Sequence, residues 1–204
     1  MLDLLPEEWE SPSGEIYRLD TDFRIGIQIC LIQNDPDMNA NEKSAKIIEL
    51  LFVDEIPYNL QDLSDCIRNF VSGWNHDKTP DKEDQKRLMD FDVDQWRIYS
   101  AFLQYYRIDL NEVEYMHWWK FMGLLSCLPE CAYTKVIDIR GKKINPKMDK
   151  DTKKALEEAK EIYNLEEVIS PEEKEISDNL YDFLGGTQGE EEKKRREIFE
   201  KFAE

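Results

Sequence analysis

The stretch from Asp90 to Leu128 constrains the fold of this chain most, because it combines dense apolar residues with helical spacing. It contains three of the five tryptophans and no proline. In its first half, apolar residues recur three and four positions apart, as on an amphipathic helix: Trp96, Tyr99, Phe102, Leu103 and Tyr106. After a short break, Asp109 is a candidate N-cap for a second helix, with apolar residues from Leu110 to Leu128 at helical spacing. Such a short turn predicts an antiparallel αα-hairpin.

Helix signals also occur on both sides of this stretch. Asp20-Thr21-Asp22 offers an N-cap for residues 23–32, whose apolar residues fit either an alternating strand or a helix. The cap and the lack of a partner strand favour the helix. Asn59 is a candidate cap for residues 60–71, and Gly73 follows that segment as a stop signal. Further helices are expected over Glu42–Phe52, Thr134–Arg140 and Asp151–Tyr163.

Together these signals predict a mainly α fold, a compact multi-helix bundle around the central aromatic-rich αα-hairpin. The core domain is expected to span residues 1–165, with residues 1–18 as an irregular arm. Within that arm, Glu15–Leu19 is the short piece expected to be extended. A charged fraction of 35% suits helices with solvated faces better than a sandwich or barrel.

Residues 166–204 are expected to form a separate acidic extension, with 13 acidic and 6 basic residues. We expect a helix over residues 170–184, a break at Gly185-Gly186, and a mobile or marginally stable helix over residues 189–204. The last of these carries a short apolar stripe: Ile198, Phe199 and Phe202. This stripe either docks weakly on the body of the protein or binds a partner by helix-in-groove recognition, which makes it the candidate partner-binding site.

The formal net charge of −18 narrows the classes of partner. A binder of nucleic-acid backbone needs a basic footprint, and an anionic membrane surface repels an acidic protein. We therefore expect protein partners, and neither nucleic acid nor membrane. The N-terminus lacks the pattern of a secretory leader, and no apolar run approaches the roughly 18 residues of a spanning helix. The chain is thus expected in the cytosol, with its cysteines as small buried hydrophobes: Cys30, Cys66, Cys127 and Cys131.

The sequence shows no pattern typical of an enzyme. Of its two histidines, His76 lies in a charged loop and His117 lies in an aromatic cluster, where a structural role is the expectation. Cys127, Cys131 and His117 would make a loose zinc set without the second tight pair that structural sites use. Phosphate-binding glycine loops and a nucleophile elbow are also missing. We therefore expect no catalytic residues, no cofactor and no metal.

Several pieces of the chain, in order, resemble the bacteriophage gene-product-fifteen family. The most specific is His117-Trp-Trp-x-Phe121 together with the upstream Tyr99-x-x-Phe-Leu-Gln-x-Tyr106 region. The others are Tyr17…Thr21-Asp22-Phe23-Arg24, Lys46-Ile-Ile-Glu-Leu-Leu-Phe52, Asp90-Phe-Asp, Ile108-Asp-Leu110 and Val136-Ile-Asp-Ile-Arg140. Together these pieces cover about residues 16–165.

The resemblance implies a protein of tailed phages or prophages of Gram-positive bacteria, of the siphovirus type. Its gene would lie between those of the major tail protein and the tape-measure protein, the position usually filled by tail assembly chaperones. Such a chaperone binds the tape-measure protein, the tail-tube protein or both in the host cytoplasm, and is absent from the mature virion. The family brings no catalytic residues, and the oligomeric state is left open.

Two other functions fit the same sequence. One is a regulatory or host-directed phage protein, such as an inhibitor of a bacterial defence system, since an acidic surface can occupy a nucleic-acid channel. The other is a minor structural component of the tail. Gene order, binding to the tail proteins and the composition of purified virions distinguish the three.

Overall fold

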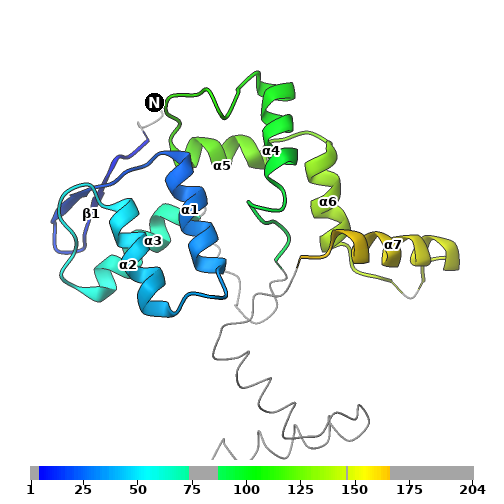
Figure 1. Ribbon diagram of the computed structural model, residues 1–204, viewed down its shortest axis with the longest axis horizontal. Helices are drawn as coiled ribbons and strands as arrows, with labels where there is room; N and C mark the ends of the chain where they lie inside the picture. The colour runs from blue at the N-terminus through cyan, green and yellow to red at the C-terminus, as the bar shows by residue number, and fades with distance from the viewer. Residues whose placement is uncertain (1–4, 74–86, 146, 166–204) are drawn as a thin grey trace, which may run out of the picture. The chain divides into compact units, whose positions relative to one another are not determined.

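The computed structural model describes residues 5–73, 87–145 and 147–165, and these residues are mainly α-helical (Figure 1). They form one compact unit except for residues 36–39, which group with a second unit whose remainder lies outside the described residues. The elements in chain order are β1 (Glu8–Glu10), β2 (Ile16–Arg18), α1 (Phe23–Asn34), α2 (Ala40–Leu51), α3 (Leu60–Ser72), α4 (Gln95–Ala101), the π-helical turn η2 (Phe102–Tyr106), α5 (Trp118–Ser126), α6 (Ala132–Gly141) and α7 (Lys150–Tyr163). The predicted mainly α class is confirmed, whereas the boundary at residue 165 stays a prediction.

Local capping explains where several helices begin. The Asp22 carboxylate accepts the backbone N–H of Arg24 at 2.9 Å, and the Asn59 side chain accepts that of Gln61 at 2.9 Å. The sequence predicted the cap at Asn59 and a cap within Asp20-Thr21-Asp22, of which the structure uses Asp22, and the ambiguous segment that follows is helical. Each cap satisfies a backbone donor that the first helical turn leaves without a partner.

A small antiparallel sheet organises the N-terminal arm. The expected extended piece is β2, and it pairs with β1, which the sequence did not predict; Trp9 lies opposite Tyr17. The Tyr17 ring meets the edge of Phe52 at a centroid distance of 6.3 Å, and the Val53 N–H donates to the Arg18 carbonyl at 3.1 Å. These contacts attach the sheet to the end of α2.

The core is centred on α5, which packs against α1. Trp118 at its start is fully buried, and its ring lies directly over Gly26 of α1. Phe121, one turn later, stacks on Phe23 of α1 and on Phe102 of η2, with centroids 5.1 and 5.0 Å apart. Trp118 is therefore a packing residue, and His117 beside it is buried, in line with the structural role expected from the sequence.

The predicted αα-hairpin is wrong in its second helix. That helix begins at Trp118 with His117 as its N-cap, and residues 107–117 are not helical. Asp109 starts a single turn, but the Arg24 guanidinium then takes the Leu110 and Val113 carbonyls at 3.3 and 2.6 Å. These contacts anchor the non-helical residues 110–113 to the start of α1.

The first helix of the predicted hairpin buries only part of the expected face. Trp96 is 68% exposed and Leu103 is 41% exposed, whereas Ile98, Ala101 and Phe102 are buried. The buried residues also lie three and four positions apart, so the short helix has apolar residues on two faces. The exposed face therefore presents a large aromatic side chain to solvent.

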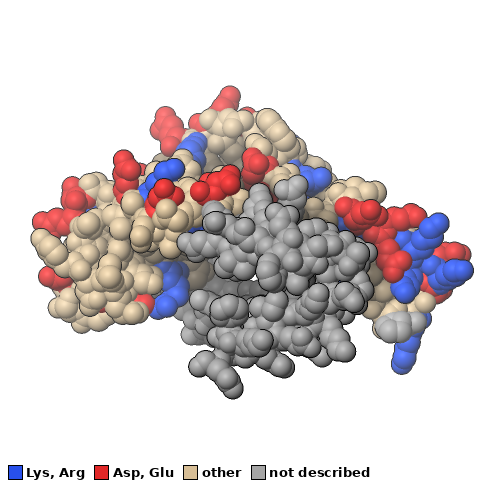
Figure 2. Space-filling view, turned by 60° about the horizontal axis from the view of Figure 1, so that its bottom comes forward, with Lys and Arg blue, Asp and Glu red and all other residues tan. Residues whose placement is uncertain are grey.

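Acidic side chains are scattered over the surface drawn in Figure 2, with uncharged residues between them. Acidic and basic side chains lie together over the α7 end, where Lys153 and Lys154 pair with Glu157 and Glu158 at 3.7 Å. No helix among the described residues is both long and apolar enough to cross a membrane.

Candidate functional site

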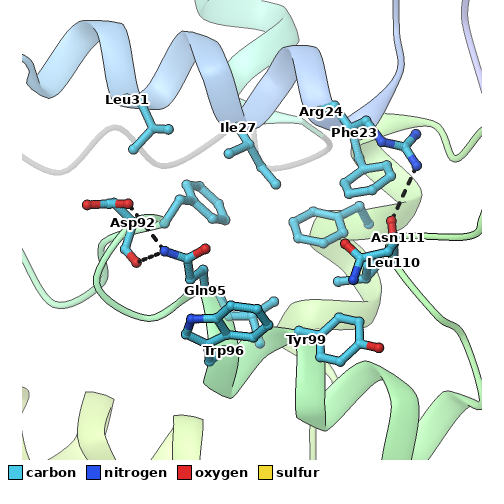
Figure 3. A pocket seen from close by; sticks show the side chains of 13 residues that line it. Phe23, Arg24, Ile27, Leu31, Asp92, Gln95, Trp96, Tyr99, Leu110 and Asn111 are labelled. Carbon is cyan, nitrogen blue, oxygen red and sulfur yellow. Dashed lines mark hydrogen bonds between the residues drawn. The ribbon is translucent and has the colours of Figure 1, made fainter.

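A groove of about 310 Å³ lies between α1 and α4, and it is the candidate functional site (Figure 3). Ile27 and Leu31 point into it from α1, and Trp96 and Tyr99 face them from α4. The inner side is closed by three buried rings: Phe23, Phe91 and Phe121. The interior is therefore apolar and largely aromatic.

The outer edge of this α1–α4 groove carries exposed apolar side chains. Trp96 is 68% exposed and Leu31 is 36% exposed, and the Trp96 ring meets the edge of Tyr99 at a centroid distance of 6.1 Å. A single exposed apolar residue needs no explanation, but a cluster beside a concave aromatic surface is typical of an interaction site.

Two of the polar side chains that line the groove, Arg24 and Gln95, are bonded to the protein itself. Arg24 donates to both carboxylate oxygens of Asp22 at 3.2 and 3.3 Å, as well as to the two carbonyls described above. The Gln95 amide donates to the Asp92 backbone and side-chain oxygens at 2.9 and 3.3 Å. These groups shape the groove and have few bonds left to offer a polar ligand.

The Tyr99 hydroxyl is also bonded within the protein. It donates to the Asp109 carboxylate at 3.0 Å, and this hydrogen bond, followed by burial, raises the pKa of Tyr99 above its ordinary value of 10.0. The phenol therefore remains protonated at neutral pH. It acts as a fixed wall of the groove and is a poor general base.

Acidic residues flank the groove at both ends. Asp92 is exposed at one end, and Asp109 and Glu112 are close to Asn111 in sequence at the other. The positive charge of Arg24 is offset by its pairing with Asp22. The rim therefore carries a negative charge beside an apolar interior.

A buried ion pair holds α4, which forms one wall of the groove, in place. Asp94 at the start of α4 is fully buried, and it accepts from Arg140 of α6 at 2.6 and 3.2 Å. Arg140 also donates to the Leu88 and Tyr163 carbonyls at 3.0 and 2.6 Å, so one guanidinium joins α4, α6 and the end of α7. Such a fully bonded buried charge pair holds the position of Trp96, two residues after Asp94.

His117 is occupied by structural hydrogen bonds. Its Nδ1 accepts the Trp119 N–H at 3.0 Å, so Nε2 carries the proton and donates to the Pro6 carbonyl at 2.9 Å. Cys127 lies at the far end of α5, roughly 15 Å away at 1.5 Å per residue, so these two cannot share a zinc ion. Within the described ranges, no group of three or more His, Cys, Asp or Glu residues is placed to hold a metal.

The cysteines differ more than the sequence predicted. Cys66 is fully buried and Cys30 is partly buried, and burial raises the pKa of each thiol to about 12. Cys131 is also partly buried, whereas Cys127 is exposed, because it caps the end of α5 where the chain turns away from the core. The expectation of a small buried hydrophobe is therefore wrong for Cys127.

The residues predicted to bind a partner cannot be compared with this groove. Ile198, Phe199 and Phe202 lie outside the described residues, as does His76. Sequence reasoning did not identify the groove, because it assigned Trp96 to the core. The available signal was Ile98, three positions before Ala101 and four before Phe102, which gives the same helix a second apolar spacing that does not include Trp96.

Comparison with known proteins identifies a family. The model of a family described as "Bacteriophage Gp15 protein" matches residues 1–165. No curated protein and no solved structure matches the chain. The matched region includes every described helix and strand, and with them both walls of the α1–α4 groove.

Proposed function

Because the chain belongs to the Bacteriophage Gp15 protein family, we propose that it is a non-enzymatic tail assembly chaperone. It binds the tape-measure protein, the tail-tube protein or both in the cytoplasm of the bacterial host. It leaves before the virion is complete. The family match over residues 1–165 is the observation that carries the proposal, since it places the chain among bacteriophage proteins.

The α1–α4 groove supports a binding role. Most of its lining residues are apolar, and Arg24 and Gln95 among the polar ones are bonded internally. An apolar side chain of another protein can enter such a site without breaking these bonds. A chaperone that covers the apolar segments of an unassembled tail protein needs a surface of this kind.

The charge of the chain supports the same role. A net charge of −18 keeps a complex with an aggregation-prone partner in solution through mutual repulsion. An inhibitor that occupies a nucleic-acid channel would be favoured by a continuous row of acids. On the face drawn in Figure 2, uncharged and basic residues separate the acidic ones. The face drawn there therefore gives the host-directed inhibitor no support.

Co-expression tests the proposal directly. The tagged chain is produced with the tape-measure protein or the tail-tube protein of the same phage, and the complexes are purified. We expect at least one of the two to co-purify, and we expect deletion of the gene to stop the formation of normal tails. Normal tails from the deletion phage, with no co-purification, would contradict the proposal. Detection of the chain in purified virions would instead identify a minor structural component.

A further inference from the structure

We propose that the α1–α4 groove binds one face of an amphipathic helix of the protein that this chain chaperones. That helix carries two large apolar side chains one turn apart and lysine or arginine residues on its flanks. The inference rests on the proposed function and names the surface that performs it. Its basis is the geometry and charge of the groove.

The volume of the groove fits two large apolar side chains. A cavity of roughly 150 Å³ lined by apolar residues accepts a benzene ring. The α1–α4 groove, at about 310 Å³, offers about twice that space between Ile27 and Leu31 on one side and Trp96 and Tyr99 on the other. An exposed Trp beside such a depression is the type of residue that contributes most to protein binding.

The length of the groove fits a helix. Its lining residues on α1 run from Phe23 to Leu31, eight residues apart and so roughly 12 Å at 1.5 Å per residue. That distance is about two helical turns, and apolar side chains at positions i and i+4 of a partner helix lie within it. The walls are helices whose backbone groups bond within α1 and α4, so these walls offer no free strand edge to an extended peptide.

The charges around the groove select the flanks of that helix. Asp92 is exposed at one end, and the pair Asp109 and Glu112 lies beside the other, while Arg24 is neutralised by Asp22. Lysine or arginine residues beside the apolar face of the partner would lie near these carboxylates. Such pairs at a solvated rim accelerate association and fix orientation more than they add affinity.

Point variants with a matched control test the groove. Overlapping fragments of the tape-measure protein, each fused to a soluble carrier, are titrated with the full chain, and the tail-tube protein is titrated in parallel. We expect Trp96→Ala and Leu31→Gln each to weaken the binding of the fragment that the wild type recognises by at least about 10-fold. The control is Tyr58→Ala, which removes a fully exposed aromatic outside the groove and should change binding by less than about 2-fold.

A separate variant tests the role of the charge at the rim of the groove. Asp92→Asn keeps the acceptor for Gln95 and removes the charge. We expect it to lower the association rate by about 2-fold or more at low salt and to have almost no effect at high salt. An equal effect at both salt concentrations would contradict the charge argument. Circular dichroism and melting curves establish that each variant is folded, which the exposure of Trp96 and Leu31 leads us to expect.

The outcomes separate the groove from the function. If both Trp96→Ala and Leu31→Gln bind as tightly as the wild type, the proposal for the groove is wrong and the proposed chaperone function stands. Failure of every fragment and of the tail-tube protein to bind the wild type overturns both. Two other occupants would also overturn the proposal. One is a second copy of the chain, shown by self-association that Trp96→Ala abolishes. The other is the chain's own segment 189–204, shown by a synthetic peptide that binds through Trp96 while partner binding does not require it.

Discussion

Replacing Gly26 with alanine should destabilise this protein, although the same change stabilises most helices. Gly26 lies inside α1, where a β-carbon would come within 2.2 Å of two atoms of the Trp118 ring. The optimal separation of two carbon atoms is about 3.5–4.0 Å, so helix or ring must move by more than about 1 Å. Trp118 has no free space, because it is fully buried among Phe70, Phe91 and Phe121.

The magnitude follows from two opposing effects. Alanine is favoured over glycine in a helix interior by about 1 kcal/mol. Overfilling a packed core costs about 1–3 kcal/mol and occasionally more. A clash of 2.2 Å with an immobile ring belongs at or beyond the upper end of that range. We therefore expect Gly26→Ala to lower the free energy of unfolding by about 2 kcal/mol, and Tm by about 4–8 °C.

Gly123 provides the matched control, since it also lies in a helix, and a β-carbon added there would meet no atom within 4 Å. Gly123→Ala should raise the stability by up to about 1 kcal/mol. Urea denaturation and thermal melting of both variants measure the change in stability, which we expect to have opposite signs in the two proteins. A Gly26→Ala protein as stable as the wild type, or more stable, would refute the close packing of α1 on α5.

Three further predictions concern other parts of the structure. Asp94→Ala should lower the stability by about 3–5 kcal/mol in urea denaturation, because it leaves the buried Arg140 without its partner, and an added Arg140→Met should recover much of that loss. Hydrogen bonds from Thr152 lower the pKa of Asp149 in the folded protein below the ordinary value of 3.8. The stabilisation by the ionised carboxylate is therefore complete above pH 3.8 and is lost as the pH falls through the folded pKa. The difference in Tm between the wild type and Asp149→Ala should accordingly vanish in strong acid. A maleimide at neutral pH should label Cys127 rapidly and should label a thiol with a pKa of about 12, such as Cys66, only after unfolding. Equal labelling rates in the native protein would contradict the burial.

Local signals made much of the fold predictable. Asp22 and Asn59 each cap the helix that follows them, and both contacts join residues two positions apart. Information of this kind is contained in a short piece of sequence. It also resolved the choice between strand and helix after Asp22, where alternation alone favoured neither.

Contacts between distant residues explain the errors. The second helix of the predicted hairpin is missing before Trp118, where Arg24 instead donates to the carbonyls of Leu110 and Val113, 86 and 89 positions away. No local pattern around Asp109 contains that donor. A plausible capping signal was therefore followed by a loop that is held by a tertiary contact.

The sequence did not predict the groove, because the face that this helix buries depends on a contact between distant residues. The helix around Trp96 has apolar residues on two faces, and the choice between them depends on Asp94, which is drawn inside by Arg140 46 positions later. The apolar spacing alone placed Trp96, Tyr99 and Leu103 on the core face together with Phe102. The structure buries Phe102 with Ile98 and leaves Trp96 at the surface.

Photo-crosslinking from the groove is the most direct measurement of its role. A photo-reactive amino acid is placed at position 96, or at position 58 as the control, and the chain is expressed in bacteria during phage assembly. We predict an adduct with the tape-measure or tail-tube protein from position 96 and none from position 58. Adducts with these proteins from position 58 alone, or adducts from position 96 with host proteins only, would contradict a tail assembly chaperone that works through the α1–α4 groove.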